Sequence, residues 1–198
     1  MDNNFEPLRD GWFKPRETAR YLIDHASTKY IIFLMSILTI ASATLQGNNV
    51  NNTNVDVLWI IFILVVILSP FYGAITFAIG AFFMWTVGKI VKGEGSFKDL
   101  FKALIGANIP VLLAFPFMLT WAILEPQSYL NDDLLTGSPI EIIASLVLLI
   151  SSIWSLINMI IAISEAHRFS IGKSLFTVFV PIIVLIALLV TLAIILVG

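Results

Sequence analysis

Long apolar segments alternate with short polar stretches along this chain. Four of them are clearly delimited, at residues 30–46, 100–124, 140–164 and 175–197. Each is close to the roughly 20 residues that an α-helix needs to cross a hydrocarbon core about 30 Å thick. The first is the shortest, and its helix is expected to start a few residues earlier, near Ala26. The pattern predicts an all-α fold, a polytopic transmembrane helical bundle.

A fifth apolar block, residues 57–88, is ambiguous in length. Its 32 residues are too many for one untilted span and too few for two spans joined by a turn. Ser69 and Pro70 interrupt the block near its middle, and a proline there removes one backbone hydrogen bond and favours a kink. We expect one tilted or kinked helix with its first turns projecting beyond the bilayer; a re-entrant element is the alternative.

The positions of the basic residues decide how often this block crosses the membrane. The 11 Lys and Arg residues fall into three clusters, at 9–29, 89–102 and 168–173. The segments 47–56 and 125–139 contain neither residue type and carry acidic residues instead. Under the positive-inside rule all three basic clusters are cytoplasmic, so the long block crosses once. The sequence therefore predicts five spans, with the N-terminus in the cytoplasm and the C-terminus outside.

Composition agrees with a membrane protein. Hydrophobic residues make up 59% of the chain and charged residues 12%, against about 25% charged residues in a typical soluble domain. The chain contains no cysteine, which excludes disulfides and thiolate metal sites. The polar first 29 residues lack the short apolar segment of a cleavable signal peptide. We expect a cytoplasmic N-terminal segment at 1–29 and a five-span membrane domain at 30–198.

The segment Pro15–Tyr30 has the pattern of an amphipathic helix. Its apolar residues recur at spacings of three, four and seven, and its charged residues occupy the other faces. Pro15 suits the first helical position, and Trp12 and Phe13 could anchor the chain at headgroup level. We expect an interfacial helix; the alternative is a helix packed on the membrane domain.

The spans carry no charged residue or histidine in their middle, which counts against a proton relay or a voltage sensor. The main polar residues at depth are Asn108, Asn158 and Ser155. They predict either interhelical hydrogen bonds or the polar lining of a cavity, and we favour the first.

Small residues in the second span, including Gly73 and Gly80, predict close helix packing, within the chain or against a partner.

Two basic loops hold the remaining candidate chemistry. In the loop Lys89–Lys98, Ser96 is expected to cap a helix beginning at Phe97. The glycines of that loop lack the Walker pattern and the preceding strand of a phosphate-binding loop. In the loop Ser164–Lys173, Glu165 and His167 are two residues apart and do not face each other on a helix. We therefore expect no catalytic site, metal site or cofactor.

Several of these pieces occur together in one known family. They are Trp12, Pro15 and Thr18 in the N-terminal segment, Lys92-Gly93-x-Gly95-Ser96-Phe97-Lys98 after the second span, Pro110 in the third, and Trp154, His167, Ser170 and Lys173 in and after the fourth. With their order among five spans, the chain resembles the Yip-domain integral membrane proteins. The resemblance covers most of the chain, and each motif in it is short.

This resemblance implies a non-enzymatic membrane protein that acts through partners. Eukaryotic members are linked with Rab-type GTPases and vesicle traffic, whereas bacterial members look like accessory proteins, some encoded with exporters and linked to envelope protection. The long cytosolic N-terminal extension of the eukaryotic members is missing here, which favours a bacterial member in the plasma membrane. The expected partners are the lipid bilayer and another membrane protein or a second copy of the chain, and not nucleic acid.

A transporter or channel for a small, weakly polar solute is the alternative function. Prolines in the second and third spans could mark broken helices around a site at the bilayer midplane, although five spans cannot divide into equal inverted repeats. The candidate partner-binding or structural residues are Trp12, Pro15, Gly93, Gly95, Ser96, Phe97, Lys98, Pro110, Trp154, Asn158, His167 and Lys173.

Overall fold

A computed structural model describes residues 5–45, 55–130 and 137–197. Within these ranges the chain is helical and contains no strand. The segment 47–56, which contains neither Lys nor Arg, lies almost wholly outside them. The elements are α1 (Pro7–Asp10), α2 (Pro15–Asp24), α3 (Thr28–Leu45), α4 (Val55–Ile90), α5 (Phe97–Ala107), the 3₁₀ helix η1 (Ile109–Leu113), α6 (Ala114–Leu124), α7 (Pro126–Leu130), α8 (Pro139–His167) and α9 (Ile171–Val197).

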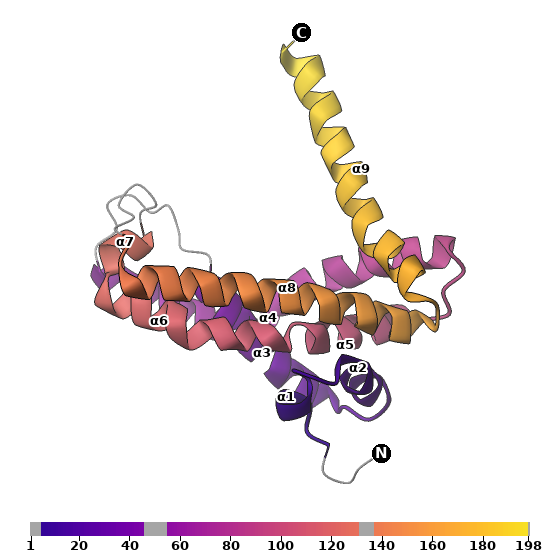
Figure 1. Ribbon diagram of the computed structural model, residues 1–198, viewed down its shortest axis with the longest axis horizontal. Coiled ribbons are helices and arrows are strands. Elements are labelled where there is room, and N and C mark those ends of the chain that lie inside the picture. Colours follow the sequence, from indigo (N-terminus) through magenta and orange to yellow (C-terminus); the bar gives the residue numbers. More distant parts are fainter. Residues whose placement is uncertain (1–4, 46–54, 131–136, 198) are drawn as a thin grey trace.

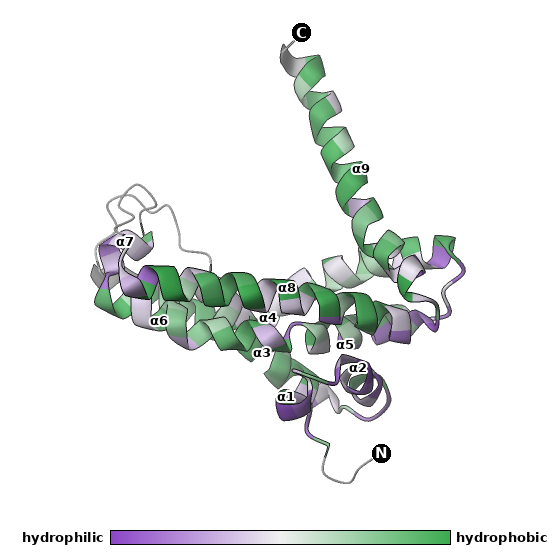
Figure 2. Ribbon diagram, viewed as in Figure 1, coloured by the Kyte–Doolittle hydropathy of each residue, from purple (hydrophilic) through white to green (hydrophobic). Residues whose placement is uncertain are grey.

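The five apolar segments of the sequence are the main helices of the fold. Helix α4, the segment from α5 to α6, α8 and α9 are long and apolar enough to cross a membrane, and α3 is a shorter apolar helix. Helices α3, α4, α6 and α8 run alongside one another, while α1 and α2 lie against one side of this bundle (Figure 1). Apolar residues cover the long helices, and polar residues gather on α1, α2 and the loops (Figure 2). The prediction of a polytopic helical bundle is confirmed.

The long apolar block forms one helix, α4, which continues through Pro70. Its 36 residues correspond to about 54 Å at 1.5 Å per residue, so it exceeds the thickness of a hydrocarbon core. Pro70 has no N–H for the carbonyl of Val66, four residues earlier. The buried hydroxyl of Ser69 donates to that carbonyl at 2.9 Å instead. The continuous helix agrees with one crossing, and the alternative of a re-entrant element is wrong.

The third apolar segment is interrupted in its middle. Helix α5 ends at Ala107, η1 follows through Pro110, and α6 resumes the α-helical course. The amide of Asn108 donates to the Leu104 carbonyl at 2.8 Å, which satisfies a backbone acceptor where the helix ends. Asn108 therefore stabilises a break within its own segment, and its amide bonds to the preceding turn of that segment.

Helix α2 packs on the bundle through the apolar stripe that the sequence indicated. Ala19 is 1% and Leu22 0% exposed, and α2 contacts both α5 and α8. Gly106 on α5 permits this approach, because a Cβ atom there would lie 2.5 Å from a Leu22 methyl group. The apolar stripe of α2 therefore packs on the membrane domain, as the alternative interpretation of this segment stated.

The small residues of α4 form a packing seam within the chain. Gly73 faces Thr39 and Met35 of α3, and Gly80 faces Leu104 of α5. Ala81 is fully buried beside them. The seam predicted from the sequence thus joins α4 to its neighbours in the same chain.

Helix α9 stands apart from the other long helices. Its first turns contact α4 and α8, where Thr177 and Val178 are fully buried. The helix contains Pro181 and leaves the bundle at a steep angle (Figure 1). Only 6% of its most apolar window is buried inside the protein. Nearly its whole circumference is therefore available to lipid or to another membrane protein.

Candidate functional site

The loop that follows α4 and the turn that follows α8 meet at one end of the bundle. The backbone N–H of Glu94 donates to the His167 carbonyl at 3.1 Å. The ammonium of Lys173 donates to the Val91 carbonyl at 3.1 Å, joining residues 82 positions apart. We call this contact between residues 88–96 and 164–173 the loop junction.

His167 is the centre of the loop junction. Its side chain is fully buried and stacks on Phe169, with ring centroids 5.0 Å apart and an angle of 10° between the planes. Gly88 and Gly93 face the imidazole so closely that a Cβ atom at either position would collide with it. Nε2 lies 3.3 Å from the Met84 carbonyl, and Nδ1 has no hydrogen-bond partner in the described structure. An imidazole enclosed in this way holds two loops together and cannot reach a substrate.

Both helices that enter the junction end in the same way. Lys92 and Arg168 have left-handed backbone conformations, with φ of 64° and 55°. After α4, the N–H of Lys92 donates to the Lys89 carbonyl and that of Gly93 to the Gly88 carbonyl. The equivalent pair of bonds follows α8, from Arg168 to Glu165 and from Phe169 to Ser164. These are Schellman motifs, in which glycine usually takes the left-handed position.

The rest of the Gly93–Lys98 motif starts α5. Gly95 passes so close to the Ala166 carbonyl that a Cβ atom would lie 2.5 Å from its oxygen. Ser96 forms a capping box with Asp99, since its hydroxyl accepts from the Asp99 N–H at 3.2 Å and its own N–H donates to the carboxylate at 2.9 Å. The predicted cap is confirmed. Phe97 stacks on Phe101, and Lys98 is exposed at the surface.

A second cluster joins the N-terminal segment to α8. Trp12 packs edge-on against Trp154, with ring centroids 6.0 Å apart, and Phe13 also contacts Trp154. The amide of the buried Asn158, one turn further along α8, donates to the Gly11 carbonyl at 3.2 Å. Trp12 is therefore a half-buried contact to α8. We call these residues the N-terminal clasp.

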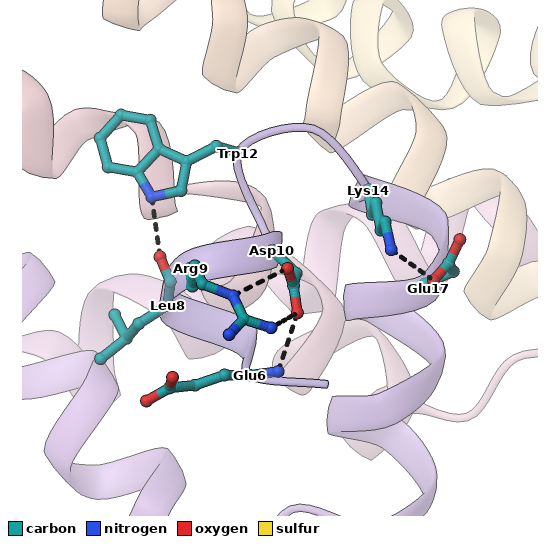
Figure 3. Close-up of polar contacts among 7 residues, drawn as sticks. All are labelled: Glu6, Leu8, Arg9, Asp10, Trp12, Lys14 and Glu17. Carbon is teal, nitrogen blue, oxygen red and sulfur yellow. Dashed lines mark hydrogen bonds and ion pairs between the residues drawn. The ribbon is translucent and has the colours of Figure 1, made fainter. Parts of the chain in front are cut away.

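Local contacts fix the shape of the segment that carries Trp12 (Figure 3). The indole N–H of Trp12 donates to the Leu8 carbonyl at 2.7 Å. Asp10 pairs with Arg9 at 3.0 Å and accepts from the Glu6 N–H at 2.9 Å. These two hydrogen bonds hold the pKa of Asp10 below its usual value, and the bond from Arg9 has the larger effect. Pro15 follows as the first residue of α2.

Ion pairs connect α2 to the loop junction. Arg16 and Arg20 on α2 both pair with Glu165, Arg16 with an N···O distance of 3.4 Å. The side chain of Glu165 is only 12% exposed. Glu165 thus points toward α2, whereas His167 points toward α4. The two side chains therefore do not form one site. Their spacing of two residues predicted this, because such residues do not face each other on a helix.

The remaining predicted residues lie near these two clusters. Pro110 is buried in η1, and its neighbour Ile109 faces Gly11 at the clasp. On the polar face of α8, Asn158 and Ser151 bond to backbone carbonyls, whereas the buried Ser155 hydroxyl has no partner in the part of the chain described. No group of three or more His, Asp or Glu residues within the described ranges could hold a metal ion.

A family model of known proteins matches most of the chain. The sequence matches the family model of the Yip1 domain over residues 10–194. This chain belongs to the Yip1-domain family. The matched region of this Yip1-domain protein begins beside the clasp and ends within α9, so it includes both clusters. No curated protein and no solved structure matches the chain significantly.

Sequence reasoning missed three glycines of this Yip1-domain protein. Gly88 admits the His167 ring, Gly11 supplies the carbonyl for Asn158, and Gly106 admits Leu22. A glycine inside an otherwise apolar helix, as at 88 and 106, is a signal of close approach that could have been used. Sequence reasoning also missed the partners of Glu165.

Proposed function

We propose that this Yip1-domain membrane protein is a non-enzymatic accessory protein that binds another membrane protein, such as an exporter. Helix α9 carries the proposal, because it extends from the bundle with nearly all of its apolar surface uncovered. The basic loops at the base of α9 would add polar contacts outside the hydrocarbon region. His167 and Glu165, the side chains that could otherwise suggest chemistry, hold the loops and α2 in place.

The proposed location is a bacterial plasma membrane. The three basic clusters, at 9–29, 89–102 and 168–173, would lie in the cytoplasm, and after five crossings the far end of α9 would lie outside. In this orientation the partner would meet α9 within the bilayer and the basic loops from the cytoplasmic side.

A transporter or channel is less well supported than an accessory protein. The asparagines expected to line its cavity bond to backbone carbonyls instead. The amide of Asn158 is engaged by the Gly11 carbonyl, and that of Asn108 by the Leu104 carbonyl. Both are consistent with structural roles, as we favoured from the sequence.

Site-specific photo-crosslinking in living cells tests the proposal. A photoreactive amino acid at Leu188 of α9 should form discrete protein adducts, and the mass of each adduct distinguishes a second copy from a different protein. Ile67 on α4 is a matched control, since it is 62% exposed and Leu188 is 63% exposed. It should react with lipid only. Failure to obtain any protein adduct at Leu188, together with purification of the chain alone in every mild detergent, would refute the proposal.

A further inference from the structure

An open surface pocket of about 600 Å³, which we call the cavity, lies between the end of α4 and the start of α9. One part of its lining is polar and cationic, with Lys92, Ser170 and Lys173. The other part is apolar, with Ile90, Val91 and Phe176. Both helices are candidate membrane spans that end or begin here, so the cavity lies where the hydrocarbon core gives way to headgroups.

The cationic side of the cavity lacks counterions in the described structure. Lys92 forms no ion pair and no side-chain hydrogen bond there, and the ammonium of Lys173 donates only to the Val91 carbonyl. The Ser170 carbonyl accepts the first helical bonds of α9, from Lys173 and Ser174. The preceding N–H groups of the helix have no intrahelical partner. Two ammonium groups and the positive end of a long helix therefore favour an anion.

The apolar side of the cavity identifies the kind of anion. Ile90 is 74% and Phe176 49% exposed, and they lie at the end of α4 and near the start of α9, two candidate membrane spans. An inorganic anion gains nothing from such a wall, whereas a phospholipid places its acyl chains against it. We propose that this cavity binds an anionic phospholipid, with its phosphate at Lys92 and Lys173. The proposal goes beyond the accessory function and does not depend on it.

The backbone of Lys92 makes a clean test possible. Its left-handed conformation is one that glycine adopts without strain, so Lys92→Gly removes the ammonium without harming the turn. Arg168→Gly is the matched control. Arg168 is also an exposed cation in a left-handed Schellman position, but it does not line the cavity.

The experiment uses the delipidated full chain in an uncharged detergent. Native mass spectrometry measures retention of phosphatidylglycerol and of phosphatidylcholine with the same acyl chains. We expect the wild type to prefer phosphatidylglycerol. Lys92→Gly should weaken that binding about tenfold, the order expected for one charge-assisted hydrogen bond, and Arg168→Gly by less than about twofold. The melting temperature of Lys92→Gly should not fall, which shows that the variant is folded.

Three results would overturn the proposal. One is equal retention of the two lipids, because two uncompensated ammonium groups must discriminate net charge. Another is an equal loss of phosphatidylglycerol binding in Lys92→Gly and Arg168→Gly. The third concerns the source of the phosphate: inorganic phosphate that displaces the lipid at equal concentration would indicate a site for a soluble anion.

Discussion

The imidazole of His167 occupies the space that a side chain on Gly93 would need. Gly93 belongs to the loop after α4, and His167 ends α8. Gly88 borders the same ring, so two glycines from one end of α4 surround a histidine from another helix. This close approach, with the hydrogen bond from Glu94 to the His167 carbonyl, couples two loops that lie far apart in the sequence.

Replacing Gly93 by alanine should disrupt this contact. The added methyl group overlaps the buried ring, and overpacking of this kind costs about 1–3 kcal/mol. Thermal unfolding in detergent should show a lower midpoint for Gly93→Ala and for Gly88→Ala.

Gly172→Ala is the control for these variants, because a Cβ atom at that position meets nothing within 4 Å. The effects of Gly93→Ala and His167→Ala should be non-additive in the double variant, since the smaller residue makes room for the methyl group. Additive effects would show that the two residues do not contact each other.

Removal of the Asn158 amide should loosen the N-terminal clasp. Asn158→Leu keeps the approximate size of the side chain but leaves the Gly11 carbonyl without its donor, which costs about 1–3 kcal/mol for a buried group. Thermal unfolding measures the loss, and proteolysis in the segment before Pro15 should become faster. Ser152→Ala, at an exposed position on the same helix, should change neither quantity. An unaltered Asn158→Leu protein would contradict the contact.

The charge of Glu165 should hold α2 on the bundle. Glu165→Gln preserves the shape of the side chain and weakens both arginine pairs, with an expected loss of about 0.5–1 kcal/mol. Hydrogen exchange in Pro15–Asp24 should become severalfold faster, and more so at low salt. Glu94→Gln serves as the control, because Glu94 and its partner Arg168 are 71% and 80% exposed and 3.9 Å apart. The same change in both variants would contradict a specific role for Glu165.

Ser69 should be essential only while residue 70 is proline. Its hydroxyl supplies the hydrogen bond to the Val66 carbonyl that Pro70 cannot supply. Ser69→Ala should therefore lower the free energy of unfolding by about 1–3 kcal/mol, and adding Pro70→Ala should restore it by providing an N–H. Ser36→Ala removes a similar hydroxyl, bonded to the Ile32 carbonyl in a helix without proline, and should have little effect. Absence of rescue by Pro70→Ala would show that Ser69 acts in another way.

The helices could be predicted from the sequence because each depends on local features. Apolar length identified the spans, and Ser96 marked the start of α5. The partners of the site residues could not be predicted, since they come from distant parts of the chain. Asn158 bonds a backbone carbonyl at Gly11, and no residue type reveals where a carbonyl will lie. Glu165 has two basic partners on α2, while the sequence offers 11 basic residues. The resemblance included Trp12 and Trp154 of the clasp and Gly93 and His167 of the loop junction, but it did not predict that the two members of each pair lie in contact.

The direction in which the chain crosses the membrane is the central claim of the five-span arrangement, and the proposed location follows from it. The absence of cysteine makes it measurable, because single cysteines can be introduced without removing any other. Suitable positions are Lys98 and Gln127, both exposed, and an added residue after Gly198. A membrane-impermeant maleimide applied to intact cells should label the cysteine at position 127 and the C-terminal cysteine, and it should label the cysteine at position 98 only after permeabilisation. Labelling of the C-terminal cysteine only after permeabilisation would contradict the five-span arrangement.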